Sequence, residues 1–381
     1  MIFNYDYEYL IHLVICAVKG IQPEEKPEGI SFENVFSLGK IHEVSNIAYL
    51  SICALQNKPE TKLLEDWKIY YYFSAQRDER QRELYKKTVS LLHQNEIRTV
   101  EAQGTITKTL YPSSEMRMMS DIDIIVDFDN LEKAKEVLTN SGFSAESVPE
   151  QDGELNFYDE NGYQIELHSE FFTEYIYNRK ERFFSALNSP FEHSKKSESD
   201  EYHYILDETY YYLYSLLHTL KHFETAGCGI RRVLDLYILK SKLSQKVDNE
   251  YIEKVLDEYG FSENMNKLYA LEETWFEDKE TEEDLSDLIR DILNAGNHGS
   301  AEVHIKNTIL KDKSEGIKHP KFAQIKRFIL PTKEYIYEEY PICKERGYSL
   351  NRARLYRFAF ALSHLNLRNA GERIKSILKA D

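Results

Sequence analysis

The chain has 381 residues, of which 42% are hydrophobic, and its 65 acidic and 48 basic side chains leave a formal net charge of −17. A chain of this length and composition can bury a sizeable core in two or three domains, which excludes an intrinsically disordered protein. The acidic balance argues against sequence-independent binding to nucleic acid, which depends on clustered lysine and arginine.

Cysteine usage and the N-terminal segment both indicate a cytoplasmic protein. The four cysteines, Cys16, Cys53, Cys228 and Cys343, are widely spaced and form no C-x-x-C pair. This spacing predicts buried free thiols in a reducing compartment. The first apolar run follows acidic residues and is too short to cross a bilayer, so we expect neither a signal peptide nor a membrane partner.

Residues 1–95 are predicted to form an N-terminal helical region. Apolar side chains recur at helical spacing in three segments, Tyr9–Val18, Val35–Leu55 and Leu63–Leu92. This period favours amphipathic helices, each of which buries one face.

Residues 96–188 hold most of the strand signals and are predicted to form a small α/β core. Ile97–Val100 is predicted to be a short strand, and Gly104 and Thr105 follow at a turn into a helix. A glycine and a hydroxyl side chain at a helix N-terminus can bring backbone N–H groups up to a phosphate. An ordinary turn glycine is the alternative interpretation of Gly104.

The segment Asp121–Val126 is predicted to be a strand that carries two carboxylates into an apolar run. Since side chains two residues apart share a face, Asp121 and Asp123 point one way and the apolar residues between and after them point the other. Paired carboxylates at the mouth of a strand can hold divalent cations such as Mg²⁺. Solvated aspartates at a strand end are the alternative.

A β-hairpin is predicted downstream of this strand. Leu155–Tyr158 and Tyr163–Leu167 alternate on either side of Asn161–Gly162, and Asn-Gly between alternating runs is a strong hairpin signal. The second strand would place Glu166 and His168 on one face, with Glu166 beside the Asp121–Asp123 strand. His168 would then be a neighbour of the carboxylates.

A polar, turn-rich stretch from Ser189 to Glu201 is predicted to separate the core from a C-terminal helical domain, residues 201–381. Helical spacing returns at 207–244 and continues near 250–272, 282–311 and 350–378. His218 and His222 lie four residues apart, a spacing that can bind zinc. Because no H-E-x-x-H pattern surrounds them, we expect them instead to pack against the face of the sheet that carries the carboxylates.

In detail the sequence resembles a bacterial branch of the DNA polymerase beta nucleotidyltransferase superfamily, described as uncharacterised nucleotidyltransferases. The matching pieces are Gly104, Leu110–Pro112, Arg117, Asp121–Val126, Glu166–His168, His218, His222 and Gly229–Asp235. The resemblance is good from about residue 97 to residue 240 and loose in both flanks. One departure is Gln103, because that branch usually has lysine before the glycine.

The resemblance implies an α+β fold with a small mixed-sheet polymerase-beta-like nucleotidyltransferase core, flanked by N-terminal and C-terminal helical regions. It implies that a nucleoside monophosphate passes from an NTP to a hydroxyl acceptor, a small molecule or a protein, with release of pyrophosphate. Mg²⁺, or Mn²⁺, would be the cofactor. Asp121, Asp123 and Glu166 would be the catalytic residues and the metal ligands, with Glu166 either a ligand or the base for the acceptor hydroxyl.

Six residues are predicted to bind the nucleotide: Gly104, Thr105, Lys108, Arg117, Arg231 and Asp235. Arg117 could pair with a phosphate bidentately, or it could be a surface arginine. Lys108 lies one turn into the helix that follows the glycine. Arg231 and Asp235 enter through the resemblance and would reach the nucleotide from the second domain.

Two other functions stay open. One is an inactive nucleotide-binding or partner-binding module, which Gln103 in place of the lysine would suit. The other is a toxin-type transferase that modifies tRNA or a protein, and here the net charge of −17 argues against tRNA. The complete set of three carboxylates favours an active enzyme.

Overall fold

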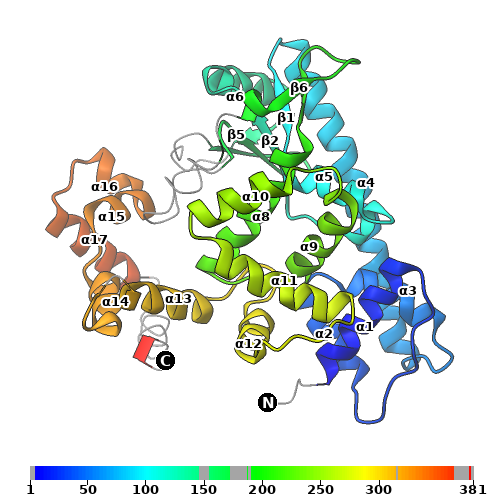
Figure 1. Ribbon diagram of the computed structural model, residues 1–381. Coiled ribbons are helices and arrows are strands. Elements are labelled where there is room, and N and C mark those ends of the chain that lie inside the picture. The colour runs from blue at the N-terminus through cyan, green and yellow to red at the C-terminus, as the bar shows by residue number, and fades with distance from the viewer. Residues whose placement is uncertain are drawn as a thin grey trace. The chain divides into compact units, whose positions relative to one another are not determined.

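The computed structural model describes residues 5–145, 154–171, 187, 190–314, 316–363 and 377–378. These residues form two compact units, both drawn in Figure 1. The first unit holds the described residues up to 297 except 222–227, and the second holds 222–227 and the described residues from 298 onward. Helices at both ends of the chain flank a mixed sheet, which confirms the predicted α+β class.

Four helices precede the sheet, as predicted for the N-terminal region. They are α1 (Asp6–Lys19), α2 (Phe32–Ile41), α3 (Ser45–Ala54) and α4 (Thr61–Gln94). α1 ends at Gly20, whose positive φ of 65° closes the last turn. The Ser31 hydroxyl caps α2 because it accepts a hydrogen bond from the Asn34 N–H. The 34 residues of α4 extend from α3 to the sheet.

Seven strands form one mixed sheet of order β3-β4-β5-β2-β1-β7-β6. They are β1 (Thr99–Glu101), β2 (Asp121–Val126), β3 (Ser144–Ala145), β4 (Glu154–Tyr158), β5 (Gln164–His168), β6 (Ser194–Lys196) and β7 (His203–Leu206). β2 runs parallel to β5 and β1 parallel to β7, whereas the other neighbours are antiparallel. The sequence does not predict β6 or β7, since both are short and β6 is a polar edge strand.

The alternation along β2 separates a buried face from an acidic face. Ile122, Ile124 and Val126 are completely buried, whereas Asp121 and Asp123 stay partly exposed on the opposite face. This is the side-chain pattern that the sequence predicts for a half-buried strand. The strand therefore anchors its carboxylates through an apolar contact on the other side of the sheet.

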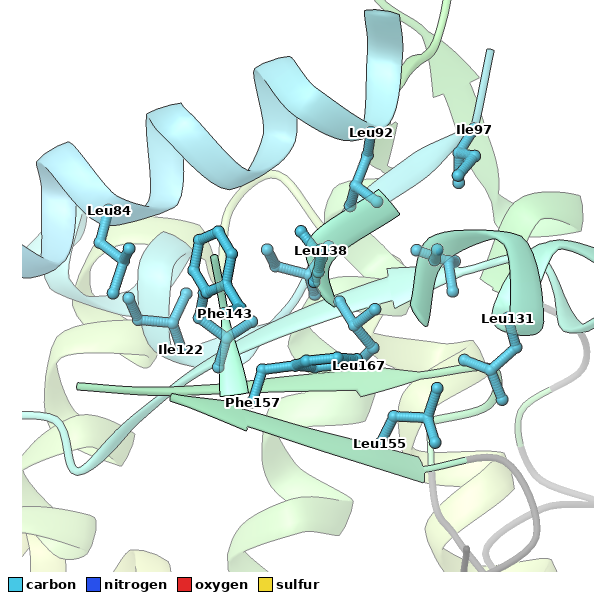
Figure 2. Packing of buried hydrophobic residues seen from close by; sticks show 14 of the residues in the cluster. Leu84, Leu92, Ile97, Ile122, Leu131, Leu138, Phe143, Leu155, Phe157 and Leu167 are labelled. Atoms are coloured by element: carbon cyan, nitrogen blue, oxygen red, sulfur yellow. The ribbon is translucent and has the colours of Figure 1, made fainter. Parts of the chain in front are cut away.

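The apolar face of the sheet packs against α4 and α6 (Leu131–Asn140), as Figure 2 shows. The buried side chains of this core are Leu84, Leu92, Ile97, Met119, Ile122, Ile124, Val126, Leu131, Ala134, Leu138, Phe143, Leu155, Phe157, Ile165 and Leu167. Because β2, β4 and β5 all contribute to this cluster, it also holds the two parallel strands β2 and β5 in register.

β4 and β5 form the predicted hairpin around Asp159–Gly162. The Asp159 N–H donates to the Tyr163 carbonyl, and the Gly162 N–H donates to the Asp159 carbonyl, each at 3.0 Å. Gly162 has a φ of 80°, which glycine adopts without steric cost. In the parallel pairing of β2 with β5, Glu166 is the register partner of Asp123. The predicted place of Glu166 beside the Asp121–Asp123 strand is therefore confirmed.

Short helical segments connect the strands, and longer helices follow the sheet. The connecting segments are α5 (Gln103–Leu110), η1 (Ser114–Met116), η2 (Phe128–Asn130) and η3 (Pro190–His193). The later helices are α8 (Glu208–Thr225), α9 (Ile230–Leu243), α10 (Asn249–Glu258), α11 (Ser262–Phe276) and α12 (Ser286–Ala295). Gly229 precedes α9, and a Cβ there would lie 2.8 Å from the backbone of Gly296 and of Asn297. Only glycine fits at this close approach.

In the described part of the second unit, further helices follow between residues 301 and 363. They are α13 (Ala301–Ser314), α14 (Pro320–Ile329), α15 (Lys333–Glu339), α16 (Pro341–Glu345) and α17 (Leu350–Ser363). Proline occupies the first position of α14 and of α16, where its missing N–H costs nothing. The predicted helical segment 350–378 is helical from Leu350 to Ser363 and at 377–378, and residues 364–376 lie outside the described residues.

Two predictions about the environment of the chain can be compared with the structure. None of the helices in the described part of the chain is long and apolar enough to cross a membrane. All four cysteines are free thiols, as predicted, and three of them are buried. The prediction of burial is wrong for Cys53, which lies in the last turn of α3 and is exposed.

Candidate active site

Three carboxylates share the face of the sheet opposite the apolar core. Asp121 and Asp123 come from β2, and Glu166 comes from the neighbouring strand β5. The side chains of Asp123 and Glu166 are 20% and 19% exposed, so both are reachable from solvent. The structure thus brings together the three residues that the sequence predicts to be catalytic.

His168 completes a compact group with two of these carboxylates. Its Nε2 atom lies 3.0 Å from Asp123 Oδ1 and 3.5 Å from Glu166 Oε2. Gln164 Nε2 donates to Glu166 Oε1 at 2.8 Å and orients that carboxylate. One oxygen of Asp123, one oxygen of Glu166 and one nitrogen of His168 lie within 4.8 Å of one another, a group that could hold a metal ion.

The concentration of negative charge changes the ionisation of the aspartates. Burial and the charges of Asp123 and Glu166 raise the pKa of Asp121 to about 6. Burial would also raise the pKa of Asp123, but the hydrogen bond and charge of His168, followed by the charges of Lys221 and Arg232, lower it. Like charges held this close favour a bound cation. The oxygen-rich donor set therefore fits a divalent metal ion.

Two cations from the C-terminal helices of the first unit act on this acidic face. Lys221 on α8 and Arg232 on α9 both lower the pKa of Asp123, and Arg232 also acts on Asp121. Burial and the charge of Arg231 lower the pKa of Arg232 to about 10, so its guanidinium stays protonated at neutral pH. These two side chains place positive charge near the three carboxylates.

Lys221 is not among the site residues predicted from the sequence. A signal for it is nevertheless present, because Lys221 lies seven residues after Tyr214 and shares its helix face. Tyr214 lies near the carboxylates, since burial, followed by the charge of Asp123, raises its pKa well above the usual value. Its ring also stacks against that of His218, with centroids 5.9 Å apart.

Gly104 and Thr105 lie in the first turn of α5, directly after β1. A Cβ at Gly104 would lie 3.1 Å from Met119 Sδ, so the helix packs tightly against the segment that enters β2. The Thr105 hydroxyl donates to the Ala102 carbonyl at 3.0 Å. The predicted contact of Gly104 and Thr105 with phosphate stays a prediction.

Lys108 is buried in an ion pair with Asp78 of α4. Its Nζ lies 2.5 Å from Asp78 Oδ1, and both side chains are 4% exposed. Ser114 also donates to this carboxylate, from Oγ to Oδ2 at 2.7 Å. The pair joins α5 to α4, and the predicted nucleotide contact of Lys108 is a further role that the structure leaves as a prediction.

Arg117 and Asp235, which the sequence analysis assigns separately to the nucleotide, pair with each other. Arg117 donates from Nε to Oδ1 at 2.9 Å and from Nη2 to Oδ2 at 3.0 Å. The Tyr111 hydroxyl also donates to Asp235 Oδ1, at 2.7 Å. Since Arg117 is 3% exposed and Asp235 0% exposed, this bidentate pair is fully buried. It joins the segment before β2 to α9.

Arg231 connects the same segment to the N-terminal helices. Its Nη1 pairs with Glu43 and donates to the Met118 carbonyl. Arg77 of α4 donates from Nε to the Met119 carbonyl at 2.8 Å and from Nη2 to the Ser120 carbonyl at 2.7 Å. The backbone directly before Asp121 is therefore fixed from two sides.

A cavity of about 590 Å³ lies elsewhere in the first unit, between α4 and the loop that joins β6 to β7. His93 lines it, with Nδ1 at 2.6 Å from Asp200 Oδ2 and Nε2 at 2.8 Å from Thr99 Oγ1. Thr99 is 1% exposed, so this relay of hydrogen bonds joins α4, β1 and the loop and presents no accessible nucleophile. None of the three predicted catalytic residues lines this cavity.

The mixed sheet presents paired strand carboxylates beside cations, and Asp123, Glu166 and His168 form a group that could hold a metal ion. The sequence matches the family model described as uncharacterised nucleotidyltransferase over residues 28–277, about two thirds of the chain. The chain belongs to this family, and its resemblance to uncharacterised nucleotidyltransferases is thereby confirmed. No curated protein and no solved structure matches the sequence.

Proposed function

We propose that this protein is a Mg²⁺-dependent nucleotidyltransferase that moves a nucleoside monophosphate from an NTP to a hydroxyl acceptor, a small molecule or a protein. The observation that carries the proposal is the parallel register of Asp123 with Glu166, in a chain that belongs to a nucleotidyltransferase family. That register gathers three carboxylates on one accessible face. The sheet and the helices that pack on it would then form a polymerase-beta-like nucleotidyltransferase core.

Asp121, Asp123 and Glu166 would hold the metal ion. Carboxylate oxygens are the ligands that Mg²⁺ takes in proteins. The raised pKa of Asp121 reflects burial and, after it, the negative charges of Asp123 and Glu166, a repulsion that a cation relieves. When bound, the ion supplies charge neutralisation for the phosphates and for the oxygens that attack and leave.

The chain's own residues position the reactants and move a proton. The acceptor oxygen forms a bond to the α-phosphorus, while the bond from that phosphorus to the bridging oxygen breaks and its electron pair leaves with pyrophosphate. In addition to its place among the metal ligands, Glu166 would accept the hydroxyl proton, and the hydrogen bond from Gln164 to its Oε1 would hold the carboxylate in position. Catalysis of this kind depends mainly on positioning and charge, with little covalent chemistry from the protein.

Two sets of residues would hold the nucleotide in place. Arg232 and Lys221 would contact its phosphates, because they are cations that already act on the carboxylates electrostatically. Gly104 and Thr105 would offer backbone N–H groups at the start of α5. The buried residues Lys108, Arg117, Arg231 and Asp235 would act on the site indirectly, by fixing α5 and the backbone before Asp121.

Calorimetric titration of each of the four NTPs, with and without Mg²⁺, tests the proposal. The wild type is compared with Asp121→Asn/Asp123→Asn and with the matched control Asp129→Asn, an exposed carboxylate in η2. We expect Mg²⁺-dependent binding of at least one NTP by the wild type and the control, lost in the double variant. Binding that the double variant retains would overturn the proposed site, and no binding of any NTP would favour the inactive module.

A further inference from the structure

The position of His168 relative to the carboxylates has a consequence for the choice of metal. Its Nε2 atom faces both carboxylates, at 3.0 Å from Asp123 Oδ1 and 3.5 Å from Glu166 Oε2. A histidine that only orients a metal ligand needs to contact that one ligand. Here the same nitrogen lies within 3.5 Å of an oxygen of each of two carboxylates.

The distances suit direct coordination. Two ligands in adjacent positions of a six-coordinate ion, with bonds of about 2.1 Å, lie about 3.0 Å apart. The distance from His168 Nε2 to Asp123 Oδ1 matches this value at 3.0 Å, and the distance to Glu166 Oε2 is somewhat longer at 3.5 Å. The whole group lies within 4.8 Å, so one ion can contact all three atoms with little movement.

Strand geometry makes this arrangement stable. His168 follows Glu166 by two residues on β5 and therefore shares its face. Their register partners on β2 are Ile125 for His168 and Asp123 for Glu166. The side chain of His168 is 16% exposed, so the imidazole is largely packed against its surroundings while part of it contacts solvent.

We propose that His168 Nε2 is a direct ligand of the divalent ion, and that the resulting nitrogen–oxygen set binds Mn²⁺ more tightly than Mg²⁺. Mg²⁺ takes oxygen ligands almost exclusively, whereas first-row transition ions also accept imidazole nitrogen. The inference rests on the metal site of the proposed function, although it does not depend on the transfer reaction. It changes the expected cofactor from Mg²⁺ to Mn²⁺ under conditions where both ions are present.

Pulsed electron paramagnetic resonance of Mn²⁺ bound to the full-length protein tests the ligand directly. A coordinated imidazole produces a nitrogen modulation of the Mn²⁺ echo, and labelling the histidines with ¹⁵N changes that modulation without any substitution. We expect the modulation in the wild type and in the control His203→Gln, a histidine on β7 whose Nε2 lies 3.8 Å from Glu101. We expect it to disappear in His168→Gln.

Equilibrium binding of the two ions completes the test. His168→Gln should weaken Mn²⁺ binding by about tenfold or more, at least the loss that follows removal of a hydrogen-bond partner of a metal ligand, and should change Mg²⁺ binding much less. Mn²⁺ bound to the wild type without nitrogen modulation would overturn the role of His168 and leave the carboxylate site of the proposed function intact. An absence of Mn²⁺ and Mg²⁺ binding, with and without NTP, would overturn both.

Discussion

Substitutions in the buried ion pair of Arg117 with Asp235 test whether Arg117 stabilises the fold or binds the nucleotide. The substitution Arg117→Ala removes the guanidinium that pairs with Asp235, whose side chain is 0% exposed. Among the described residues, the Tyr111 hydroxyl then remains as a hydrogen-bond donor to this carboxylate. Breaking a buried ion pair by removing one partner costs about 3–5 kcal/mol. We therefore expect the free energy of unfolding of the first unit to fall by about this amount.

The assay follows urea unfolding by tryptophan fluorescence. The chain has two tryptophans, Trp67 in α4 and Trp275 in α11, and both belong to the first unit. Their signal therefore reports on the unit that contains the pair. The double variant Arg117→Met/Asp235→Leu removes both charges, and we expect it to be more stable than Arg117→Ala, because no buried charge is then left uncompensated.

NTP binding measured on the same variants decides between the two roles. If Arg117 acts only by fixing the backbone before Asp121, the apolar double variant should bind NTP within a few-fold of the wild type once folded. The reasoning is refuted if Arg117→Ala unfolds within about 1 kcal/mol of the wild type and yet fails to bind NTP. That result would make Arg117 a direct phosphate ligand.

Three further predictions concern pH, charge and packing. His42 is fully buried, accepts a hydrogen bond from the Ile230 N–H at Nδ1, and has a pKa that burial lowers to about 4. Its pKa in the unfolded chain is about 6.5. The free energy of unfolding should therefore keep its full value above pH 6.5 and fall by about 3 kcal/mol toward pH 4, because the unfolded state binds the proton first. Urea midpoints at several pH values should show a shallower acid decline for His42→Gln, and an unchanged decline would contradict this. Arg232→Gln should weaken NTP binding in calorimetry by about tenfold, whereas the control Arg80→Gln, on an exposed part of α4, should bind NTP like the wild type. If Arg232→Gln binds NTP as tightly as the control does, Arg232 does not belong to the site. Gly229→Ala should destabilise the first unit by about 1–3 kcal/mol because its Cβ would meet backbone at 2.8 Å, and a wild-type urea midpoint would refute that contact.

The local patterns of the sequence predict the acidic face well. The alternation in Asp121–Val126 requires that one face be buried, and the turn at Asn161–Gly162 pairs β4 with β5. These two short-range signals predict which side chains share a face within β2 and within the β4–β5 hairpin. The parallel pairing of β2 with β5, which places Glu166 beside Asp123, joins residues that are far apart in the chain, and only the family resemblance indicated it.

Contacts between distant parts of the chain are harder to predict. Arg117 and Asp235 are 118 residues apart, and Lys108 is 30 residues from Asp78, so no local pattern shows that these charges neutralise each other. A motif shows only that a charged residue is present, whereas its role depends on which partner it meets in the fold. For the same reason the sequence leaves open whether Arg232 reaches the nucleotide or is a surface charge, whereas in the fold this side chain is 8% exposed and acts on the carboxylates.

The most direct measurement for the central claim is the position of a metal ion and a nucleotide in a crystal of the wild type with Mn²⁺ and a non-hydrolysable NTP. The account predicts an anomalous Mn²⁺ peak about 2.0–2.3 Å from oxygens of Asp121, Asp123 or Glu166, with the triphosphate between this ion and Arg232. Nucleotide bound in the cavity beside His93, with no ion at the carboxylates, would contradict it.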